Sequence, residues 1–379
     1  MAKTKVLIIR NNLPGAFGGG ETYQLTLAEQ LRRHHFEPII ISSCRQLKRE
    51  AKRRGIHTKL AWRCRMQNWS GWRNLLLPLY FLWQLILTLR YCWLFLWLRP
   101  AAVNVQSRDD LIAATIAGKL CCTRVLWTDH ADFRNWVFQN IEVKHKNLIG
   151  KTILKLAPWA YRIILISDAD GNYFRSLKGC AQLQNIAVIK NGVIDEAHEY
   201  HAKPAMDFCY VGRIVKEKGI GELLEAFELV VKKNKQAKLH LYGDGPDFDY
   251  FKKHCKSQSV LFHGFTDQPL KMMAKSQIYV LPSYAEGLSL SLLEACMMSR
   301  TIIATEVGGN PEIIQDCKNG RLVPAKDSEA LARAMLRLLN DPELCREYGK
   351  AARKTYELEF DFVKTFEREM LLLYVKEKK

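Results

Sequence analysis

The residues best suited to chemistry in this 379-residue sequence are two glutamates, Glu286 and Glu294. Glu286 stands in a polar loop beside Gly287, whereas Glu294 lies inside an apolar stretch that predicts a helix. An unpaired carboxylate inside such a helix is costly, so Glu294 needs a partner. The start of the helix, capped by Ser289 or Ser291, would direct backbone N–H groups and a positive dipole end between the two glutamates. A phosphate flanked by sugar hydroxyls satisfies all these groups, and a core helix in which a lysine pairs with Glu294 is the alternative.

Two cations form a second candidate group. Arg213 and Lys218 are five residues apart on a short loop that is bounded by Gly212 and Gly219. The loop follows a strand predicted at 208–211 and precedes a predicted helix. At such a place an arginine fork and a lysine point charge can both grip a diphosphate. Two solvated surface cations are the alternative, which the position between a strand and a helix disfavours.

The predicted elements around these groups follow the order of two Rossmann-like halves. The first half begins with a strand at 5–10, a glycine-rich loop and a helix from about 21 to 33. Further strands are predicted at 38–42, 102–106, 124–128, 163–167 and 186–189, and then at 208–211, 239–242, 260–264, 278–282 and 301–305. His130 follows the strand at 124–128, and ligands of open parallel sheets gather at the carboxyl ends of strands.

Several motifs in one order resemble a known family. EGLSLSLLEA at 286–295 resembles the signature of the retaining family-4 glycosyltransferases, which have two Rossmann-like domains in the GT-B arrangement. The unit around Arg213 and Lys218, the turn at Asn191-Gly192 and the GGxPE turn at 308–312 are similar to the family's motifs and extend the resemblance over nearly the whole chain. Asp195 departs from the family's pattern by one residue, because Ile194 intervenes.

The resemblance implies an α/β fold of the GT-B type, with two Rossmann-like doubly wound domains, a cleft between them and a C-terminal crossover helix. Residues 1–200 are expected to form the acceptor-binding domain with a basic, membrane-facing region. Residues 204–360 are expected to bind the nucleotide sugar, after a linker at about 195–203. Residues 361–379 are expected to form the crossover helix that returns to the first domain.

The resemblance also implies a reaction and a set of site residues. A hexose passes from a nucleotide diphosphate sugar, most often UDP-linked in this family, to a hydroxyl with retention at the anomeric carbon. Glu294 would accept the ribose hydroxyls and Glu286 the sugar hydroxyls, while the departing phosphate accepts the acceptor's proton. The residues expected in catalysis are His130, Glu286, Arg213 and Lys218. Those expected to bind the donor are Gly19, Gly20, Gly212, Arg213, Lys218, Gly243, Gly287, Leu288, Ser289, Leu290 and Glu294.

No metal or other cofactor is expected besides the nucleotide-sugar co-substrate. Asp168-Ala169-Asp170 spells the DxD pattern of the other large glycosyltransferase architecture, but three-residue patterns recur by chance. An N-terminal helix cap by Ser167 or Asp168 explains the aspartate in this pattern without a metal.

Positive charge is concentrated in the first half of the chain. The net charge is +18, and residues 1–200 carry 29 Lys and Arg against 14 Asp and Glu, an excess of 15. Twelve of these cations lie between Leu31 and Arg73, opposed by Glu37 and Glu50 alone. Such a surface attracts the phosphates of an anionic membrane, a lipid-linked acceptor or a nucleic acid. A lipopolysaccharide core is the acceptor that best suits so dense a cluster, ahead of a polyprenyl-diphosphate-linked glycan or a glycolipid.

The stretch 75–98 is apolar enough to be considered as a membrane span. Its 24 residues contain one charge, Arg90, and one glutamine, Gln84. Pro78, these two polar residues and the α/β pattern on both sides argue against a span. Four tryptophans lie between positions 72 and 97, which favours a helix in the membrane interface. A buried core helix remains the alternative.

Eleven cysteines without any CxxC pair predict reduced thiols in a cytoplasmic compartment. The first residues lack the apolar core of a signal peptide, so we expect a cytoplasmic protein on the inner face of the membrane. Three other functions fit the sequence less well. A nucleotide-sugar epimerase needs several acid–base groups that the sequence does not show. A nucleic-acid-binding protein would leave Glu286, Glu294, Arg213 and Lys218 idle, so no nucleic-acid partner is expected. A membrane structural protein anchored by 75–98 is the third.

Overall fold

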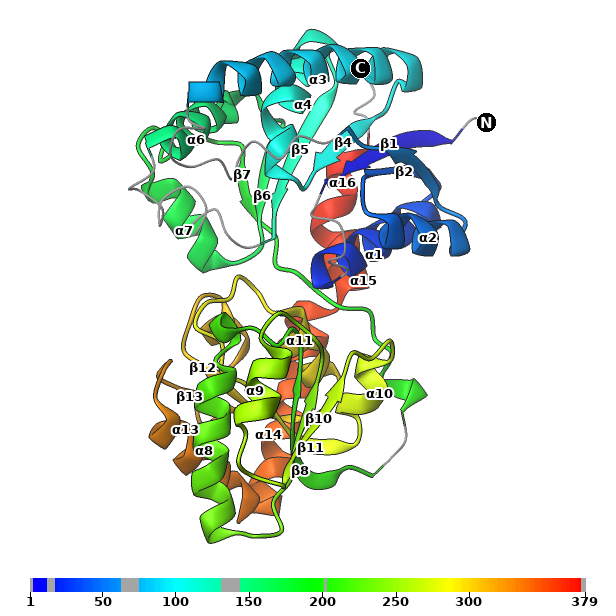
Figure 1. Ribbon diagram of the computed structural model, residues 1–379. Helices are drawn as coiled ribbons and strands as arrows, with labels where there is room; N and C mark the ends of the chain where they lie inside the picture. Colours follow the sequence, from blue (N-terminus) through cyan, green and yellow to red (C-terminus); the bar gives the residue numbers. More distant parts are fainter. Residues whose placement is uncertain (1–2, 12–17, 63–74, 131–143, 201–202, 376–379) are drawn as a thin grey trace. The chain divides into compact units, whose positions relative to one another are not determined.

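The computed structural model describes residues 3–11, 18–62, 75–130, 144–200 and 203–375 (Figure 1). The chain divides into two compact units, Met1–Lys190 with Val363–Lys379, and Asn191–Phe362. Each unit is built around one parallel sheet with helices packed on it. The predicted α/β class with two Rossmann-like doubly wound units is confirmed.

The first unit contains a seven-stranded sheet in the order β3-β2-β1-β4-β5-β6-β7, with every pairing parallel. The order reverses between β1 and β4, and at such a switch point the loops at the carboxyl ends separate and leave room for a ligand. The strands are β1 (Thr4–Ile9), β2 (Phe36–Ser42), β3 (His57–Leu60), β4 (Ala102–Val105), β5 (Arg124–Asp129), β6 (Arg162–Leu165) and β7 (Ile186–Val188).

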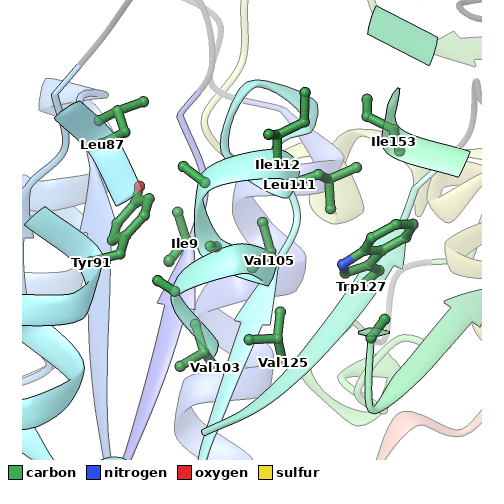
Figure 2. Close-up of a cluster of buried hydrophobic side chains, with 14 of the residues drawn as sticks. Ile9, Leu87, Tyr91, Val103, Val105, Leu111, Ile112, Val125, Trp127 and Ile153 are labelled. Atoms are coloured by element: carbon green, nitrogen blue, oxygen red, sulfur yellow. The ribbon is translucent and has the colours of Figure 1, made fainter. Parts of the chain in front are cut away.

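Apolar side chains from this sheet and its helices form a continuous core, part of which is drawn in Figure 2. Ile9, Val105 and Trp127 come from three neighbouring strands, while Leu87 and Ile153 come from helices that cover them. The helices are α1 (Gly19–Arg33), α2 (Arg45–Arg53), α3 (Leu77–Leu98), α4 (Arg108–Leu120), α6 (Lys144–Leu156), the 3₁₀ turn η3 (Ala157–Trp159) and α7 (Asp168–Ser176).

The C-terminal segment packs on this first unit. It consists of α15 (Phe362–Thr365), the π-helix η7 (Phe366–Met370) and α16 (Leu371–Tyr374). The Tyr374 hydroxyl accepts a hydrogen bond of 2.7 Å from Asn104 Nδ2 in β4. The Tyr23 hydroxyl in α1 lies 3.6 Å from Met370 Sδ. These buried contacts attach the end of the chain to the unit in which the chain begins.

The second unit contains a six-stranded parallel sheet in the order β10-β9-β8-β11-β12-β13, which reverses between β8 and β11. The strands are β8 (Ala205–Val211), β9 (Leu239–Tyr242), β10 (Val260–Gly264), β11 (Ser276–Leu281), β12 (Thr301–Thr305) and β13 (Arg321–Val323). The helices are η4 (Ala197–Glu199), η5 (Lys216–Lys218), α8 (Ile220–Lys233), α9 (Phe248–His254), α10 (Pro269–Met273), α11 (Leu290–Met297), α12 (Asn310–Ile313), α13 (Ser328–Leu339), α14 (Pro342–Thr355) and the π-helix η6 (Tyr356–Phe360).

The stretch 195–203, in which a linker was expected, begins inside the second unit. Asp195 pairs with Arg353 at the end of α14, and Arg353 Nη1 also donates to the Met297 carbonyl at 2.8 Å. Val193 forms a β-bridge to Asp361, so the segments in which the chain enters and leaves the second unit lie side by side. The structure therefore places the divisions after Lys190 and after Phe362.

The apolar stretch 75–98 forms α3, the one helix in the described chain that is long and apolar enough to cross a membrane. About two fifths of its most apolar window, 39%, is buried within the fold.

Candidate active site

The loops that follow β8 and β11 bring together two of the predicted site residues. Lys218 Nζ lies 2.6 Å from Glu286 Oε1, although 68 residues separate them in the sequence. Ser283 Oγ donates to the same carboxylate oxygen at 2.6 Å. The pair stands at the switch point of the sheet, where a ligand of this fold is expected. Both side chains keep some exposure, 23% for Lys218 and 10% for Glu286, so a ligand can reach them.

Close approach of the backbone builds this corner of the unit. Gly308 has φ +53°, and a Cβ atom there would lie 1.7 Å from the Glu286 carbonyl oxygen. Gly243 has φ +141°, and a Cβ atom there would lie 1.8 Å from the Gly212 carbonyl oxygen. A side chain at either position would be strained and would also displace the neighbouring loop. The glycines thus hold the loop after β9 against the loop after β8, and the loop after β12 against the loop after β11.

Arg213 leaves the loop after β8 with an exposed side chain. Its carbonyl oxygen accepts a 2.8 Å hydrogen bond from the buried Tyr210 hydroxyl, which fixes the backbone at this point. Among the described residues no hydrogen bond or ion pair engages its guanidinium. An arginine held at its backbone with a free fork is suited to take a phosphate.

Glu294 is partly buried in α11 and carries no lysine partner. No described residue forms a hydrogen bond or ion pair with its carboxylate, so the alternative of a lysine-paired core carboxylate is not found in this part of the chain. Burial, with the charge of Glu196 nearby, raises the pKa of Glu294 to about 7. A carboxylate under this penalty gains most from a ligand that donates hydrogen bonds, such as a pair of ribose hydroxyls.

The first turn of α11 begins at Leu290, with Ser289 in the capping position. The expected side-chain cap is not formed. Ser289 Oγ lies 3.1 Å from Ser291 Oγ, which in turn accepts a 2.8 Å hydrogen bond from the Tyr279 hydroxyl. The first N–H groups of a helix have no partner within it, so those at Leu290 and Ser291 remain suited to an anion.

In the first unit, His130 follows β5 and lies against α1. Its ring centroid is 4.3 Å from that of Tyr23, and His130 Nε2 is 3.1 Å from Gln106 Oε1. Burial, together with the positive charge of Arg10, holds the pKa of His130 well below its usual value. The imidazole is therefore neutral near pH 7.

Arg10, at the end of β1, organises the predicted glycine loop and was missed in the sequence. Arg10 Nε donates a 3.0 Å hydrogen bond to Glu21 Oε1, and Glu21 Oε2 accepts from the Gly18 N–H at 3.1 Å. Gly19 and Gly20 form the first turn of α1, and a Cβ atom on Gly20 would lie 2.0 Å from the Arg10 guanidinium. Position in the sequence could have indicated both Arg10 and Gln106, because each directly follows a strand at the switch point.

The DxD pattern at 168–170 begins α7 as a helix cap. The Asp170 N–H donates to Ser167 Oγ at 3.1 Å, and the Ser167 hydroxyl donates to the Asp170 carboxylate at 2.7 Å. Asp168 pairs with Lys190 at 3.3 Å. Over the described ranges of the chain, no cluster of three or more His, Cys, Asp and Glu is arranged to hold a metal ion.

Comparison with known proteins places this architecture in a family. The family model described as Glycosyltransferase Family 4 matches residues 17–197, and that described as Glycosyl transferases group 1 matches residues 195–355. The putative glycosyltransferase EpsD of Bacillus subtilis is 33% identical over 267 residues, which are 66% of this chain and 69% of that protein. The chain belongs to glycosyltransferase family 4. The resemblance drawn from its motifs is thereby confirmed.

Other relatives of this family-4 glycosyltransferase share part of its length. A poly(ribitol-phosphate) alpha-N-acetylglucosaminyltransferase of Staphylococcus aureus is 32% identical over 177 residues, which are 45% of this chain and 36% of that protein. The chain thus matches about a third of that relative.

Two solved structures have the same fold as this glycosyltransferase. Anabaena HepE in complex with UDP and glucose superimposes with a TM-score of 0.76 at 19% identity, over 98% of this chain and 99% of HepE. The lipopolysaccharide outer core galactosyltransferase WaaB superimposes with a TM-score of 0.66 at 20% identity, over 97% of this chain and 99% of WaaB.

Proposed function

We propose that this glycosyltransferase moves a hexose from a UDP-linked donor to a membrane-associated glycan, with retention at the anomeric carbon. The observation that carries the proposal is the Lys218–Glu286 pair at the switch point of the second unit. Lys218 supplies a cation for a diphosphate, and Glu286 supplies a carboxylate for sugar hydroxyls. The two side chains are within hydrogen-bond distance of each other. The complex of HepE with UDP and glucose supports the choice of donor.

The chemistry asks the protein mainly to stabilise a departing diphosphate. The bond between the anomeric carbon and the phosphate oxygen breaks, and its electron pair leaves with UDP. Lys218, the free fork of Arg213 and the first N–H groups of α11 compensate the charge that develops there. The acceptor oxygen forms its bond to the anomeric carbon on the same face, and its proton passes to the departing phosphate oxygen.

Two glutamates orient the donor in this proposal. Glu294 accepts hydrogen bonds from the ribose hydroxyls, which compensates the carboxylate for its burial. The second oxygen of Glu286 bonds to none of the described residues and accepts from the sugar. Because the positive charges of the protein perform the stabilisation, the reaction needs no divalent metal.

The acceptor and the location complete the proposal. Poly(ribitol-phosphate) and the lipopolysaccharide outer core appear in the names of similar proteins, and these names describe a phosphate polymer and a glycan attached to lipid. The excess of 15 positive charges in residues 1–200 suits such an acceptor at an anionic membrane. We therefore place the enzyme at the cytoplasmic face of the membrane, with lipopolysaccharide core as the preferred acceptor.

The proposal is tested by supplying purified enzyme with UDP-hexoses, each with and without lipopolysaccharide core. Release of UDP that depends on the acceptor, and an α-linked product by NMR from an α-linked donor, are expected. A β-linked product would exclude retention. Hexoses linked to other nucleotides are assayed in parallel, and turnover of these alone would exclude a UDP-linked donor. An epimerised sugar nucleotide formed without acceptor would indicate epimerisation in place of transfer.

A further inference from the structure

Helix α3 presents a long apolar face to solvent. The face is made of large side chains spaced three or four residues apart, each 53% to 64% exposed: Leu82, Leu85, Leu89, Trp93, Leu96 and Trp97. Trp93 and Trp97 stack with ring centroids 5.2 Å apart. A soluble monomer rarely exposes so continuous an apolar surface, so this face is suited to contact with another apolar phase.

The opposite face of α3 is fixed in the fold by polar as well as apolar contacts. The Tyr91 hydroxyl donates to Asp110 Oδ1 at 2.6 Å, and Gln84 Nε2 donates to the Asp109 carbonyl at 2.9 Å. Tyr91 and Leu87 point into the core between the helix and the sheet (Figure 2). A helix that crossed a bilayer would have to break these buried bonds, so α3 contacts its apolar phase with one face only.

Two cations lie beside the exposed face, Lys59 and Arg90. Lys59 Nζ lies 4.5 Å from the centre of the Trp97 ring. Arg90 stacks on Trp62 at 4.2 Å and so attaches a further exposed tryptophan beside the helix. Between Glu50 and Asp109 the sequence contains ten Lys and Arg and no Asp or Glu. An apolar face with a cationic border matches the acyl region and the phosphates of an anionic lipid leaflet.

The same charge argues against a second copy of the chain as the occupant. A symmetric dimer through α3 would bring two identical cationic borders together, since each subunit contributes the same surface. Like charges at that distance repel and oppose such an interface. Tryptophan beside lysine, in contrast, is the composition that membrane interfaces favour.

We propose that α3 lies flat in the interface of an anionic bilayer, with its Leu and Trp face inserted below the headgroups. The helix has 22 residues and so offers an apolar edge about 33 Å long. Lys59 and the exposed Lys119, near the C-terminal end of α4, meet lipid phosphates at the border. This inference refines the membrane location proposed above, but it rests on the surface of α3 and not on the transfer reaction.

The test is co-sedimentation with vesicles of phosphatidylcholine and phosphatidylglycerol, compared with phosphatidylcholine alone. The full-length variant Leu85→Glu with Leu89→Glu should bind at least about tenfold more weakly than wild type, because two exposed leucines that are proposed to insert into the bilayer are lost. Leu358→Glu is the matched control, since Leu358 in the second unit is 65% exposed and Leu89 is 64% exposed. The control should bind as wild type does. Circular dichroism and UDP-hexose hydrolysis report whether each variant is folded.

A second readout follows the tryptophans directly. Brominated lipids should quench part of the wild-type fluorescence, and replacing Trp93 and Trp97 by Phe should remove most of that quenching. Vesicle binding unchanged by the two glutamates would overturn the proposal. A loss of self-association in solution, with vesicle binding intact, would assign the face to a second copy instead. Normal vesicle binding without any UDP-hexose turnover would leave this inference standing and remove the proposed donor.

Discussion

Lys218 and Glu286 meet at 2.6 Å, so the lysine proposed for the diphosphate and the carboxylate proposed for the sugar hold each other in place before any donor binds. Ser283 adds a second hydrogen bond to the same oxygen. The ion pair orients both side chains in advance, which reduces the ordering that donor binding would otherwise require. It also means that neither residue can be removed without changing the other.

This coupling gives the first prediction. Lys218→Met should lower kcat/KM by at least about tenfold, because the diphosphate loses a cation and faces the unpaired charge of Glu286. Glu286→Gln should also reduce turnover. The double variant Lys218→Met with Glu286→Gln should lose less activity than the sum of the two single effects, expressed as free energies, predicts. The measurement is a double-mutant cycle on UDP-hexose hydrolysis. Strict additivity would show that the pair does not act as a unit.

Glu294 gives a prediction about pH. Its pKa near 7 in the fold lies above the usual value, so the carboxylate form, which accepts from ribose hydroxyls, grows as pH rises through 7. The affinity for UDP should therefore increase between pH 6 and 8 in wild type and stay flat in Glu294→Gln. Calorimetric titration with UDP at several pH values measures this, and an equal pH dependence in both proteins would contradict the assignment.

The same residue affects stability with a defined sign. A carboxyl group whose folded-state pKa is raised costs nothing below its unfolded pKa of 4.5, where both states are protonated. The cost appears as pH rises towards 7 and is complete above it. Glu294→Gln should thus raise the free energy of unfolding at pH 8 by roughly 1–3 kcal/mol and leave it unchanged at pH 4. Chemical unfolding curves at the two pH values provide the comparison, and a gain of equal size at both would contradict it.

His130 and Arg10 predict a shift in the pH–rate profile. Burial and the charge of Arg10 lower the pKa of His130. Protonation of the ring should therefore limit activity only at pH values below 6.5, the usual pKa of histidine. Arg10→Met removes part of this effect and should move the acidic limb of kcat to higher pH. Arg10→Lys keeps the charge and serves as the control. A profile identical in Arg10→Met and wild type would show that His130 does not titrate in the reaction.

Metal independence is tested without mutation. Because Lys218, Arg213 and the start of α11 are proposed to stabilise the leaving diphosphate, activity should be complete in excess EDTA. Loss of activity that manganese restores would contradict metal independence and make Asp168 and Asp170 candidate metal ligands. Their present contacts are a helix cap and an ion pair with Lys190.

Local pattern was enough for most of the fold. The strand at 301–305 was predicted to the residue, since a β-branched run between polar turns permits little else. The edge strands β3 and β13 were missed because HTKL and RLV are short and their burial is incomplete. Helix α2 was missed because its sequence, RQLKREAKR, has only Leu47 and Ala51 on a buried face.

The site was harder to predict than the fold. Motifs located Glu286 and Lys218, but their direct contact spans 68 residues and depends on the switch point that only the assembled sheet creates. Arg10 carries no motif of its own. Its importance lies in the approach of its guanidinium to Gly20 and Glu21, which no local spacing indicates.

The basic surface of α2 gives the last prediction, and the structure decides which residues to change. Arg54 pairs with Glu29 at 3.2 Å and with Glu50 at 3.2 Å, so reversing its charge would disturb the packing of α2 against α1. Arg45, Arg49 and Lys52 are exposed and, within the described chain, form no ion pair.

Replacing these three residues by Glu should release the enzyme from anionic vesicles at low salt, since each cation near such a surface contributes about 1 kcal/mol. In high salt the Debye length falls to about 3 Å, and there the variant should keep the same residual vesicle binding as wild type. Three matched Lys or Arg to Glu changes in the second unit, at the exposed Lys233, Lys253 and Arg346, are the control for net charge. Co-sedimentation across a salt series distinguishes them. If the α2 variant binds like the control at every salt concentration, α2 does not face the membrane.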